Sequence, residues 1–425
     1  MTTSKDKAFV WIFLPQEASP TVAGVVQNVN EKYYFTYGQS YLSNPKAIAI
    51  FPEELPLIKG TFSPKHNIAS CLRDASPDAW GRRVILHALY NSGMISDKYD
   101  ELDEITFFLK SGSDRIGALD FQESSEHYIA RLQNDIKLKD LLEAVSYIEE
   151  GKKLNYDLTL ALLHGTSIGG ARPKVFINSS NQKFIAKFSS SDDYYDIIRA
   201  EYIVMKLAKK CGIDVADVQL ESSLNKDVLL VKRFDRKRVG ESWTRKLMLS
   251  ALTLLNLHEM EARYASYEDF ALLIRHKFSS PKNTLKELFK RLVFNILVGN
   301  TDDHARNHAA FWDGEKYKLT PAYDICPQPR SGSMAGQAMK IIGQDNRSLL
   351  INCLSSSKNY LLSEEESIEI IRAMIQTIES EWESICINSG IKKIDKILLE
   401  TNQIFNPYIF EEISKHTQII KNPNG

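Results

Sequence analysis

The sequence predicts an α+β protein with a small β-rich N-terminal domain and a mainly helical C-terminal half. Up to about residue 122, short apolar runs alternate with turn residues, which is typical of strands joined by hairpins. From Thr244 onward, apolar residues recur with the helical period. A chain of 425 residues is long enough for two or three domains. We expect domains at 1–125, 126–240 and 241–425.

The N-terminal elements are predicted from alternating apolar residues and turn signals. We expect strands at 8–14, 23–29 and 33–37, a helix at 78–90 and a closing strand at 117–121. The turn Asn30-Glu31-Lys32 separates the second strand from the third and indicates a hairpin.

The middle segment mixes helix and strand. We expect helices at 138–149 and 193–210, hairpin strands at 173–178 and 182–188, and a buried strand at 228–231. Gly212 is placed to cap the second helix. In the C-terminal half we expect helices at 244–257, 267–277, 283–298, 363–388 and 407–416. One hairpin, with strands at 309–312 and 317–319, turns at Asp313-Gly314.

Composition narrows the class of protein. Hydrophobic residues make up 43% and charged residues 25%, and the net charge is -1, so the chain as a whole is not a basic nucleic-acid binder. The five cysteines are scattered without a C-x-x-C pair, which argues against disulfides or a zinc site and fits a reducing cytoplasm. No apolar stretch approaches the ~20 residues that span a bilayer, so we expect a cytoplasmic protein without membrane contact.

The segment 294–307 carries the strongest chemical signal. It is mostly apolar up to Gly299 and then almost entirely polar. Asp302 stands five residues before Asn307, the spacing of the protein-kinase catalytic loop, where the Asp accepts a hydroxyl proton and the Asn holds magnesium. The neighbouring Asp303 lacks this spacing. The alternative is a polar loop after a buried helix.

Phosphoryl transfer also requires groups that hold the phosphates. Ser167 to Lys174 is glycine-rich, although an ordinary glycine turn would look the same. Lys187 lies among apolar residues of the following strand, and Glu201 falls on the apolar stripe of the next helix. The two could form the lysine–glutamate pair of kinases. Alternatively, Lys187 is a surface lysine and Glu201 borders the stripe.

Two further segments fit the order of kinase elements. Lys232 to Phe234 follows a buried strand and could offer backbone groups to adenine, although a charged strand end explains it equally well. Asp324 follows the C-terminal hairpin and could hold a second metal contact, although Asp is frequent at strand exits.

A different metal chemistry is the main alternative for the loop. Asp302, Asp303, His304 and His308 could hold zinc or iron if this segment were helical. Gly299-Asn300 argues for a loop, which favours the kinase interpretation.

Together these segments resemble the HipA family, the serine/threonine kinase toxins of bacterial type II toxin–antitoxin modules. The resemblance covers nearly the whole chain. It rests on Ser167–Lys174, Arg233–Arg236, Asn300–Asn307 and Leu319–Asp324, in the family's order, and on Leu72–Arg82 and Asp114–Leu119 in the N-terminal domain. It implies a two-lobed protein-kinase-like fold after the N-terminal domain.

The resemblance implies a role for each motif residue. Asp302 would be the catalytic base, and Asn307 and Asp324 would hold Mg²⁺. ATP would be bound by Gly169, Gly170, Ala171, Arg172, Lys174, Lys187, Lys232, Phe234, His304, Asn307 and Asp324. Ser167 matches the serine that family members autophosphorylate. A phosphate there adds about -1.5 to -2 charge beside the nucleotide, which would inactivate the enzyme by repulsion.

The resemblance also implies partners. Family members bind a helix-turn-helix antitoxin, contact operator DNA mainly through it, and several phosphorylate aminoacyl-tRNA synthetases. Two other functions stay open from the sequence: a pseudokinase-like binding subunit of an antitoxin–DNA repressor complex, and a small-molecule kinase of the same superfamily.

Overall fold

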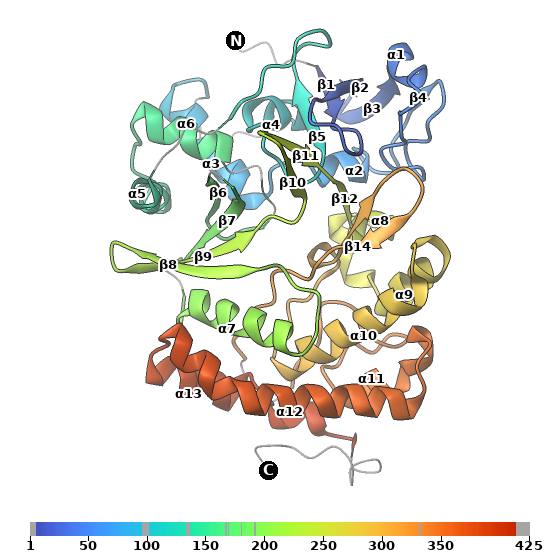
Figure 1. Cartoon of the computed structure of the whole chain (residues 1–425). Helices are drawn as coiled ribbons and strands as arrows, with labels where there is room; N and C mark the ends of the chain where they lie inside the picture. Colours follow the sequence, from blue (N-terminus) through green and yellow to red (C-terminus); the bar gives the residue numbers. More distant parts are fainter. Residues whose placement is uncertain are drawn as a thin grey trace. The chain divides into compact units, whose positions relative to one another are not determined.

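The computed structural model describes residues 6–95, 102–132, 137–165, 168, 170–179, 181–190, 193–330, 332 and 334–413. The chain divides into two compact units, each assembled from separated segments (Figure 1). The first unit contains 1–190, 221–249 and 311–315, and the second contains 191–220, 250–310 and 316–425. The predicted division at 125 and 240 into three domains stays a prediction.

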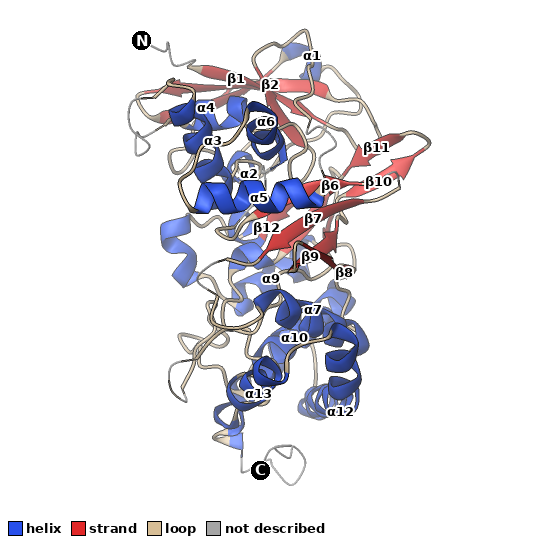
Figure 2. Cartoon of the chain, turned by 90° about the vertical axis from the view of Figure 1, so that its left-hand side faces the viewer, coloured by secondary structure: helices blue, strands red, loops and turns tan. Residues whose placement is uncertain are grey.

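The N-terminal part of the first unit is built on a five-stranded antiparallel sheet in the order β4-β3-β2-β1-β5. Its strands are β1 (Lys7–Ile12), β2 (Thr21–Val29), β3 (Lys32–Tyr37), β4 (Thr61–Phe62) and β5 (Leu119–Gln122). The predicted hairpin pairs Val29 with Lys32, and its turn places Asn30 and Glu31 in the left-handed region. Figure 2 shows α4 (Glu104–Lys110) beside this sheet.

A second sheet of the first unit has the order β6-β7-β9-β8. Its strands are β6 (Lys174–Asn178), β7 (Lys183–Phe188), β8 (Val218–Ser223) and β9 (Lys226–Lys232). The remaining helices that begin in this unit are α1 (Gln39–Leu42), α2 (Ser70–Arg73), α3 (Ala79–Asn91), α5 (Leu138–Glu149) and α6 (Tyr156–Gly165). One core cluster joins Trp80 of α3 to Leu141 of α5, Leu162 of α6 and Val175 of the sheet. The N-terminal domain and the second sheet therefore share one hydrophobic core.

The predicted helix at 244–257 is wrong over most of its length. Residues 242–245 form β11 (Ser242–Arg245), which pairs with β10 (Arg236–Val239) in an antiparallel hairpin. Only α8 (Ala251–Leu254) is helical, and the Ser250 side chain caps it by accepting the Thr253 N–H. Aromatic and β-branched residues such as Trp243 and Thr244 favour a strand once a partner strand is present, and that pairing overrides the helical periodicity.

The second unit is mainly helical. Its helices include α7 (Ile197–Lys210), α9 (Tyr267–Lys277), α10 (Pro281–Leu297), α11 (Leu350–Ser355), α12 (Glu364–Ser389) and α13 (Lys393–Asn402). Short 3₁₀ turns are η1 (Glu259–Tyr264), η2 (Ala305–Asn307), η3 (Ser357–Tyr360) and η4 (Pro407–Phe410). In this unit α7 packs along α12 (Figure 1). The strands β12 (Leu247–Ser250), β13 (Ala309–Trp312) and β14 (Tyr317–Leu319) lie where the chain passes between the units.

Two other helix boundaries differ from the prediction. The helix α7 begins at Ile197 rather than at 193, because the Asp196 side chain caps it by accepting the Arg199 N–H at 3.0 Å. Tyr194 therefore lies outside the helix and is 90% exposed. Of the predicted helix at 407–416, the described residues form only η4, and residues 414–416 lie outside the described part.

A buried ion network ties the N-terminal domain to the second sheet. The Arg233 Nη1 lies 2.8 Å from Asp114 Oδ1, and the Arg236 Nη2 lies 2.9 Å from the same oxygen. Both guanidinium groups also contact Asp235 Oδ2 at 2.8 Å, and Lys183 contacts Asp114 at 2.7 Å. Burial alone would raise the pKa of Asp114, but the surrounding cations, Arg233, Arg236, Lys183 and Arg245, outweigh it and hold that pKa well below its usual range.

The first prediction concerns this network. Asp114→Asn leaves Arg233 and Arg236 buried without one of their two carboxylate partners, so the free energy of unfolding should fall by about 3–5 kcal/mol. Because the folded pKa of Asp114 is lowered, its contribution is complete above the ordinary Asp pKa of about 4 and is lost as the pH falls through the folded value. Urea unfolding at several pH values measures both effects.

The control for this prediction is the exposed pair between Lys46 and Glu17, which lie 2.6 Å apart. Glu17→Gln should change the free energy of unfolding by no more than about 1 kcal/mol. An equally small effect of Asp114→Asn would contradict the role of the network.

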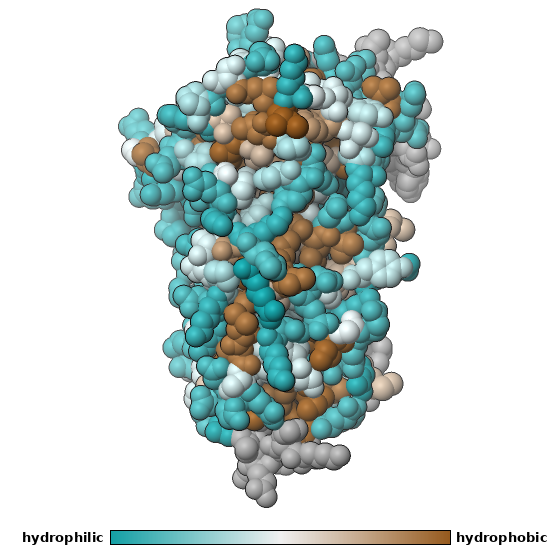
Figure 3. All heavy atoms as spheres, turned by 90° about the vertical axis from the view of Figure 1, so that its right-hand side faces the viewer, coloured by the Kyte–Doolittle hydropathy of each residue, from teal (hydrophilic) through white to brown (hydrophobic). Residues whose placement is uncertain are grey.

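Within the described part of the chain, no helix is long and apolar enough to cross a membrane. On the face drawn in Figure 3, hydrophobic residues form separate groups among hydrophilic side chains. The described cysteines are all free thiols, as their scattered positions predict.

Candidate active site

The loop from Gly299 to Asn307 follows the buried helix α10. Gly299 has φ +67°, and a Cβ there would lie 2.9 Å from the main-chain oxygen of Gln403, so only glycine fits. The Gln328 N–H donates to the Gly299 oxygen at 3.0 Å, and the Ala338 N–H donates to the Thr301 oxygen at 3.1 Å. The second unit therefore fixes the start of the loop through backbone contacts.

The two neighbouring aspartates of the loop have opposite environments. The side chain of Asp302 is exposed, whereas Asp303 is only 2% exposed. The Asp303 carboxylate accepts from the Tyr267 hydroxyl and lies 2.9 Å from Nε2 of His308. The Asp302 main-chain oxygen accepts from the His304 N–H at 2.9 Å and from Asn307 Nδ2 at 3.1 Å. Asp303 is thus engaged in the interior, and Asp302 faces outward.

The electrostatic surroundings of Asp302 suit a proton acceptor. The protein around its carboxylate partly removes it from water, which raises the pKa of Asp302. His304 acts in the opposite direction, and the negative charge of Asp324 raises the pKa further. The influence of Asp324 shows that the structure brings together two carboxylates that lie far apart in the sequence.

Asn307 and Asp324 offer oxygen ligands of the kind that Mg²⁺ prefers. Because Asn307 donates through Nδ2, its Oδ1 is the atom left to accept or to bind a cation. Asp324 has φ +60°, a conformation that costs energy for a non-glycine residue and is common at functional sites. These residues fit a magnesium site. The described residues contain no group of three or more His, Cys, Asp or Glu able to hold a metal, so the zinc or iron alternative gains no support.

The glycine-rich segment lies in the first unit, and Ser167 and Gly169 are outside the described residues. The Gly170 N–H donates to Asp78 Oδ2 at 2.8 Å, and the Gly170 oxygen accepts from the Trp80 N–H at 3.2 Å. The indole N–H of Trp80 donates to the main-chain oxygen of Lys174 at 3.0 Å. The first turn of α3 therefore holds both ends of the segment from Gly170 to Lys174.

Two buried lysines face each other across the hairpin that follows. Lys174 of β6 and Lys187 of β7 are directly paired in the antiparallel register, and they are 6% and 8% exposed. Residues opposite each other in such a pair lie on the same face of the sheet, where two like charges repel. The Lys174 Nζ reaches back to Gly170, since it lies 2.4 Å from where a Cβ on Gly170 would be. Cations gathered beside a glycine-rich turn suit an anionic ligand.

The predicted pair of Lys187 with Glu201 stays a prediction. Both side chains are buried, but Lys187 belongs to the first unit and Glu201 to the second.

One residue of the predicted hinge, Arg233, has a structural role in the buried ion network. The Arg233 side chain lies in the buried ion network, and its N–H donates to the Lys183 oxygen at 2.8 Å. Lys232 and Phe234 are only half-buried, and their contact with adenine stays a prediction.

Residue type and spacing did not single out four residues that contact the candidate site residues or their neighbours: Asp78, Trp80, Tyr267 and His308. Trp80 and Asp78 stand in a motif that was assigned only to the N-terminal domain. His308 was considered only as a metal ligand, whereas it contacts Asp303. One signal was available in the sequence: Asp303 directly follows Asp302, and a buried carboxylate there would need hydrogen-bond donors such as Tyr267 and His308.

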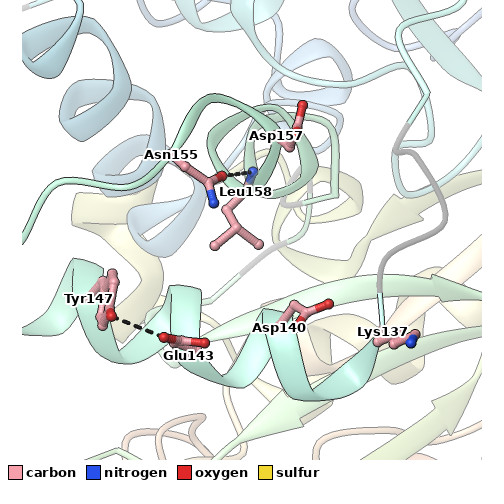
Figure 4. A pocket seen from close by; sticks show the side chains of 7 residues that line it. All are labelled: Lys137, Asp140, Glu143, Tyr147, Asn155, Asp157 and Leu158. Atoms are coloured by element: carbon pink, nitrogen blue, oxygen red, sulfur yellow. Dashed lines mark hydrogen bonds between the residues drawn. The ribbon is translucent and has the colours of Figure 1, made fainter.

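A cavity of about 540 Å³ lies in the first unit between α5 and α6 (Figure 4). Its lining includes Lys137, Asp140, Glu143, Tyr147, Asn155, Asp157 and Leu158. Figure 4 shows Tyr147 directed at Glu143 and Asn155 at the Leu158 N–H, so these groups bond to one another. None of the predicted site residues lines this cavity.

Comparisons with known proteins show which family the chain resembles. Residues 18–122 match the HipA N-terminal domain, and residues 166–382 match the HipA-like C-terminal domain. The putative kinase Y4mE of Sinorhizobium fredii is 30% identical over 130 residues, which is 29% of this chain and 31% of that protein. The serine/threonine-protein kinase toxin HipA of Shewanella oneidensis is 25% identical over 185 residues, 37% of this chain and 42% of that toxin. These alignments span less than half of either relative.

The fold has a solved counterpart. One chain of the Shewanella oneidensis complex of HipA, HipB and operator DNA aligns with 92% of this chain and 94% of its own length. The TM-score is 0.67 at 16% sequence identity, so the likeness concerns the fold. The α+β prediction is confirmed: a β-rich N-terminal domain precedes a kinase-like fold with a mainly helical C-terminal lobe. The chain belongs to the HipA family.

The second prediction concerns the glycine-rich segment. Gly170→Ala adds a methyl group at φ +101°, where it would meet Nζ of Lys174, and should weaken binding of an ATP analogue at least about 10-fold, since a 1.4 kcal/mol strain corresponds to that factor. Calorimetric titration measures the affinity. Gly151→Ala is the control, because Gly151 also has positive φ (+68°) but has no atom within 4 Å of its Cβ position. Equal affinities of the two variants would contradict the expected role of the glycine-rich segment in binding ATP.

Proposed function

We propose that this chain is an ATP- and magnesium-dependent serine/threonine protein kinase that acts as the toxin of a toxin–antitoxin module. The observation that carries the proposal is the loop in which Asp302 faces outward while Asp303 is engaged by Tyr267 and His308. The side chain of Asn307 is bonded to the main chain of Asp302 in the same loop. Family membership and relatives named as kinases support this interpretation.

Each candidate residue would have a separate role in phosphoryl transfer. Lys174, Lys187 and the turn at Gly170 would bind the ATP phosphates together with Gly169, Ala171 and Arg172. Lys232 and Phe234 would contact adenine, and His304 would lie beside the nucleotide. Mg²⁺, held by Asn307 and Asp324, would neutralise phosphate charge.

Asp302 would act as the proton acceptor. The substrate hydroxyl oxygen attacks the γ-phosphorus, the bond from that phosphorus to the ADP oxygen breaks, and the hydroxyl proton passes to Asp302. Its raised pKa would make it a better base than an ordinary aspartate.

We also propose an antitoxin partner and operator DNA contacted mainly through it. The solved HipA relative forms a complex with HipB and operator DNA, and that chain shares this fold over most of its length. The net charge of -1 fits DNA contact made chiefly by a partner. The substrate class that we propose is a translation factor such as an aminoacyl-tRNA synthetase, and phosphoproteomics after brief expression would identify it.

The third prediction tests the enzyme. Incubation with γ-labelled ATP and Mg²⁺ should label either the chain itself or a protein in an added cell lysate. Asp302→Asn should reduce the labelling at least about 10²-fold, because general-base catalysis contributes typically 10²–10⁴-fold. No label on any protein would overturn the kinase in favour of a binding subunit. Label transferred only to a small metabolite would favour a small-molecule kinase.

The fourth prediction concerns Ser167 as a regulatory phosphosite. A phosphate there would add negative charge beside the nucleotide phosphates and oppose ATP binding. Ser167→Ala should therefore remain active for longer and arrest growth more strongly on expression. A variant no more toxic than the wild type would contradict inhibition by autophosphorylation, and intact-mass spectrometry would report whether the wild type carries the phosphate.

A further inference from the structure

The interior side of the catalytic loop contains a second pair of residues with the same five-residue spacing. Asp302, which is exposed, and Asn307, which is 8% exposed, form the first pair, and Asp303 and His308 form the inward pair. The inward side chains are both 2% exposed, and Nε2 of His308 lies 2.9 Å from Asp303 Oδ1. Because a carboxylate only accepts hydrogen bonds, Nε2 carries a proton in this contact.

A tyrosine from another helix completes the interior contact. The hydroxyl of Tyr267, the first residue of α9, donates to Asp303 Oδ2 and lies 3.4 Å from Nε2 of His308. Tyr267 is fully buried, and its ring packs edge-on against the imidazole at 5.5 Å between centroids. Phe270, one turn further along α9, also contacts that imidazole. The Asp303 carboxylate thus receives two donors that are themselves held by packing.

The far end of the loop is fixed through the backbone. The main-chain oxygen of His308 accepts from the Ala251 N–H at 2.7 Å, and the next residue, Ala309, accepts from the Thr320 N–H at 3.0 Å. A bond from Asp303 to His308 therefore sets the span between residues 303 and 308. Asp302 and Asn307 lie one residue before each end of this span, so their separation depends on it.

We propose that Asp303, His308 and Tyr267 form a clamp that positions Asp302 and Asn307 for phosphoryl transfer. The clamp residues act through the loop and do not touch ATP or substrate. Their role in catalysis rests on the proposed kinase function, whereas their effect on loop order does not. A positioning network of this kind typically changes activity by about 10- to 100-fold when it is broken.

The test compares two substitutions of His308 and one substitution of Tyr267. His308→Gln keeps an N–H donor at about the reach of Nε2, and His308→Ala removes it. Tyr267→Phe removes only the hydroxyl donor and keeps the ring packing. Phosphate transfer from labelled ATP would be measured over a Mg²⁺ titration, together with hydrogen exchange of segment 301–309 and the melting temperature.

We expect His308→Ala to lower kcat about 10- to 100-fold and to raise the Mg²⁺ concentration for half-activation, with KM for ATP changed less than about 3-fold. Hydrogen exchange in segment 301–309 should become faster. His308→Gln should restore most of the wild-type kcat, Mg²⁺ dependence and hydrogen exchange. Tyr267→Phe should give values between those of His308→Ala and His308→Gln. A purely structural role would lower the melting temperature without moving the Mg²⁺ dependence.

The clamp is overturned if folded His308→Ala and His308→Gln show equal exchange in the loop and equal Mg²⁺ dependence. If the wild-type protein transfers no phosphate, the proposed kinase function fails, and the exchange rates still decide whether the clamp orders the loop.

Discussion

The buried contact of Arg233 and Arg236 with Asp114 and Asp235 is the interaction on which the first unit depends most. Each carboxylate is shared by both guanidinium groups, and all four side chains are nearly inaccessible. Burying one such charge without its partners would cost several kcal/mol, so the network is stable only when the N-terminal domain and the second sheet are both in place. The motif Arg233–Arg236, part of which resembles a nucleotide hinge, therefore also connects the N-terminal domain to the second sheet.

The glycine-rich segment provides a second connection between the N-terminal domain and the second sheet. There Asp78 and Trp80, from the same N-terminal domain, bond to the backbone of Gly170 and Lys174. The N-terminal domain thus contacts the second sheet just after β9, at Arg233, and at the turn before Lys174.

Much of the fold was predictable because its signals are local. The hairpins at Asn30-Glu31 and Asp313-Gly314, and the helices α5, α9 and α12, follow from turn residues and apolar periodicity. The segment after Thr244 was predicted wrongly because its strand pairing with Arg236–Val239 is a contact between two segments, not a local preference. Likewise, the sequence placed Asp302 and Asn307 in one loop but did not reveal which aspartate the interior engages.

The sequence by itself determined the candidate chemistry: a loop with Asp302 and Asn307, a glycine-rich turn before Lys174, and Asp324 after a hairpin. These depend on residue type and spacing, which the chain carries directly. Only the tertiary structure decided that Asp303 is held by Tyr267 and His308, that Lys174 stands opposite Lys187, and that Asp78 bonds to Gly170. The reason is physical: a buried charge or a backbone N–H must find a partner, and which partner lies within reach depends on how distant segments pack.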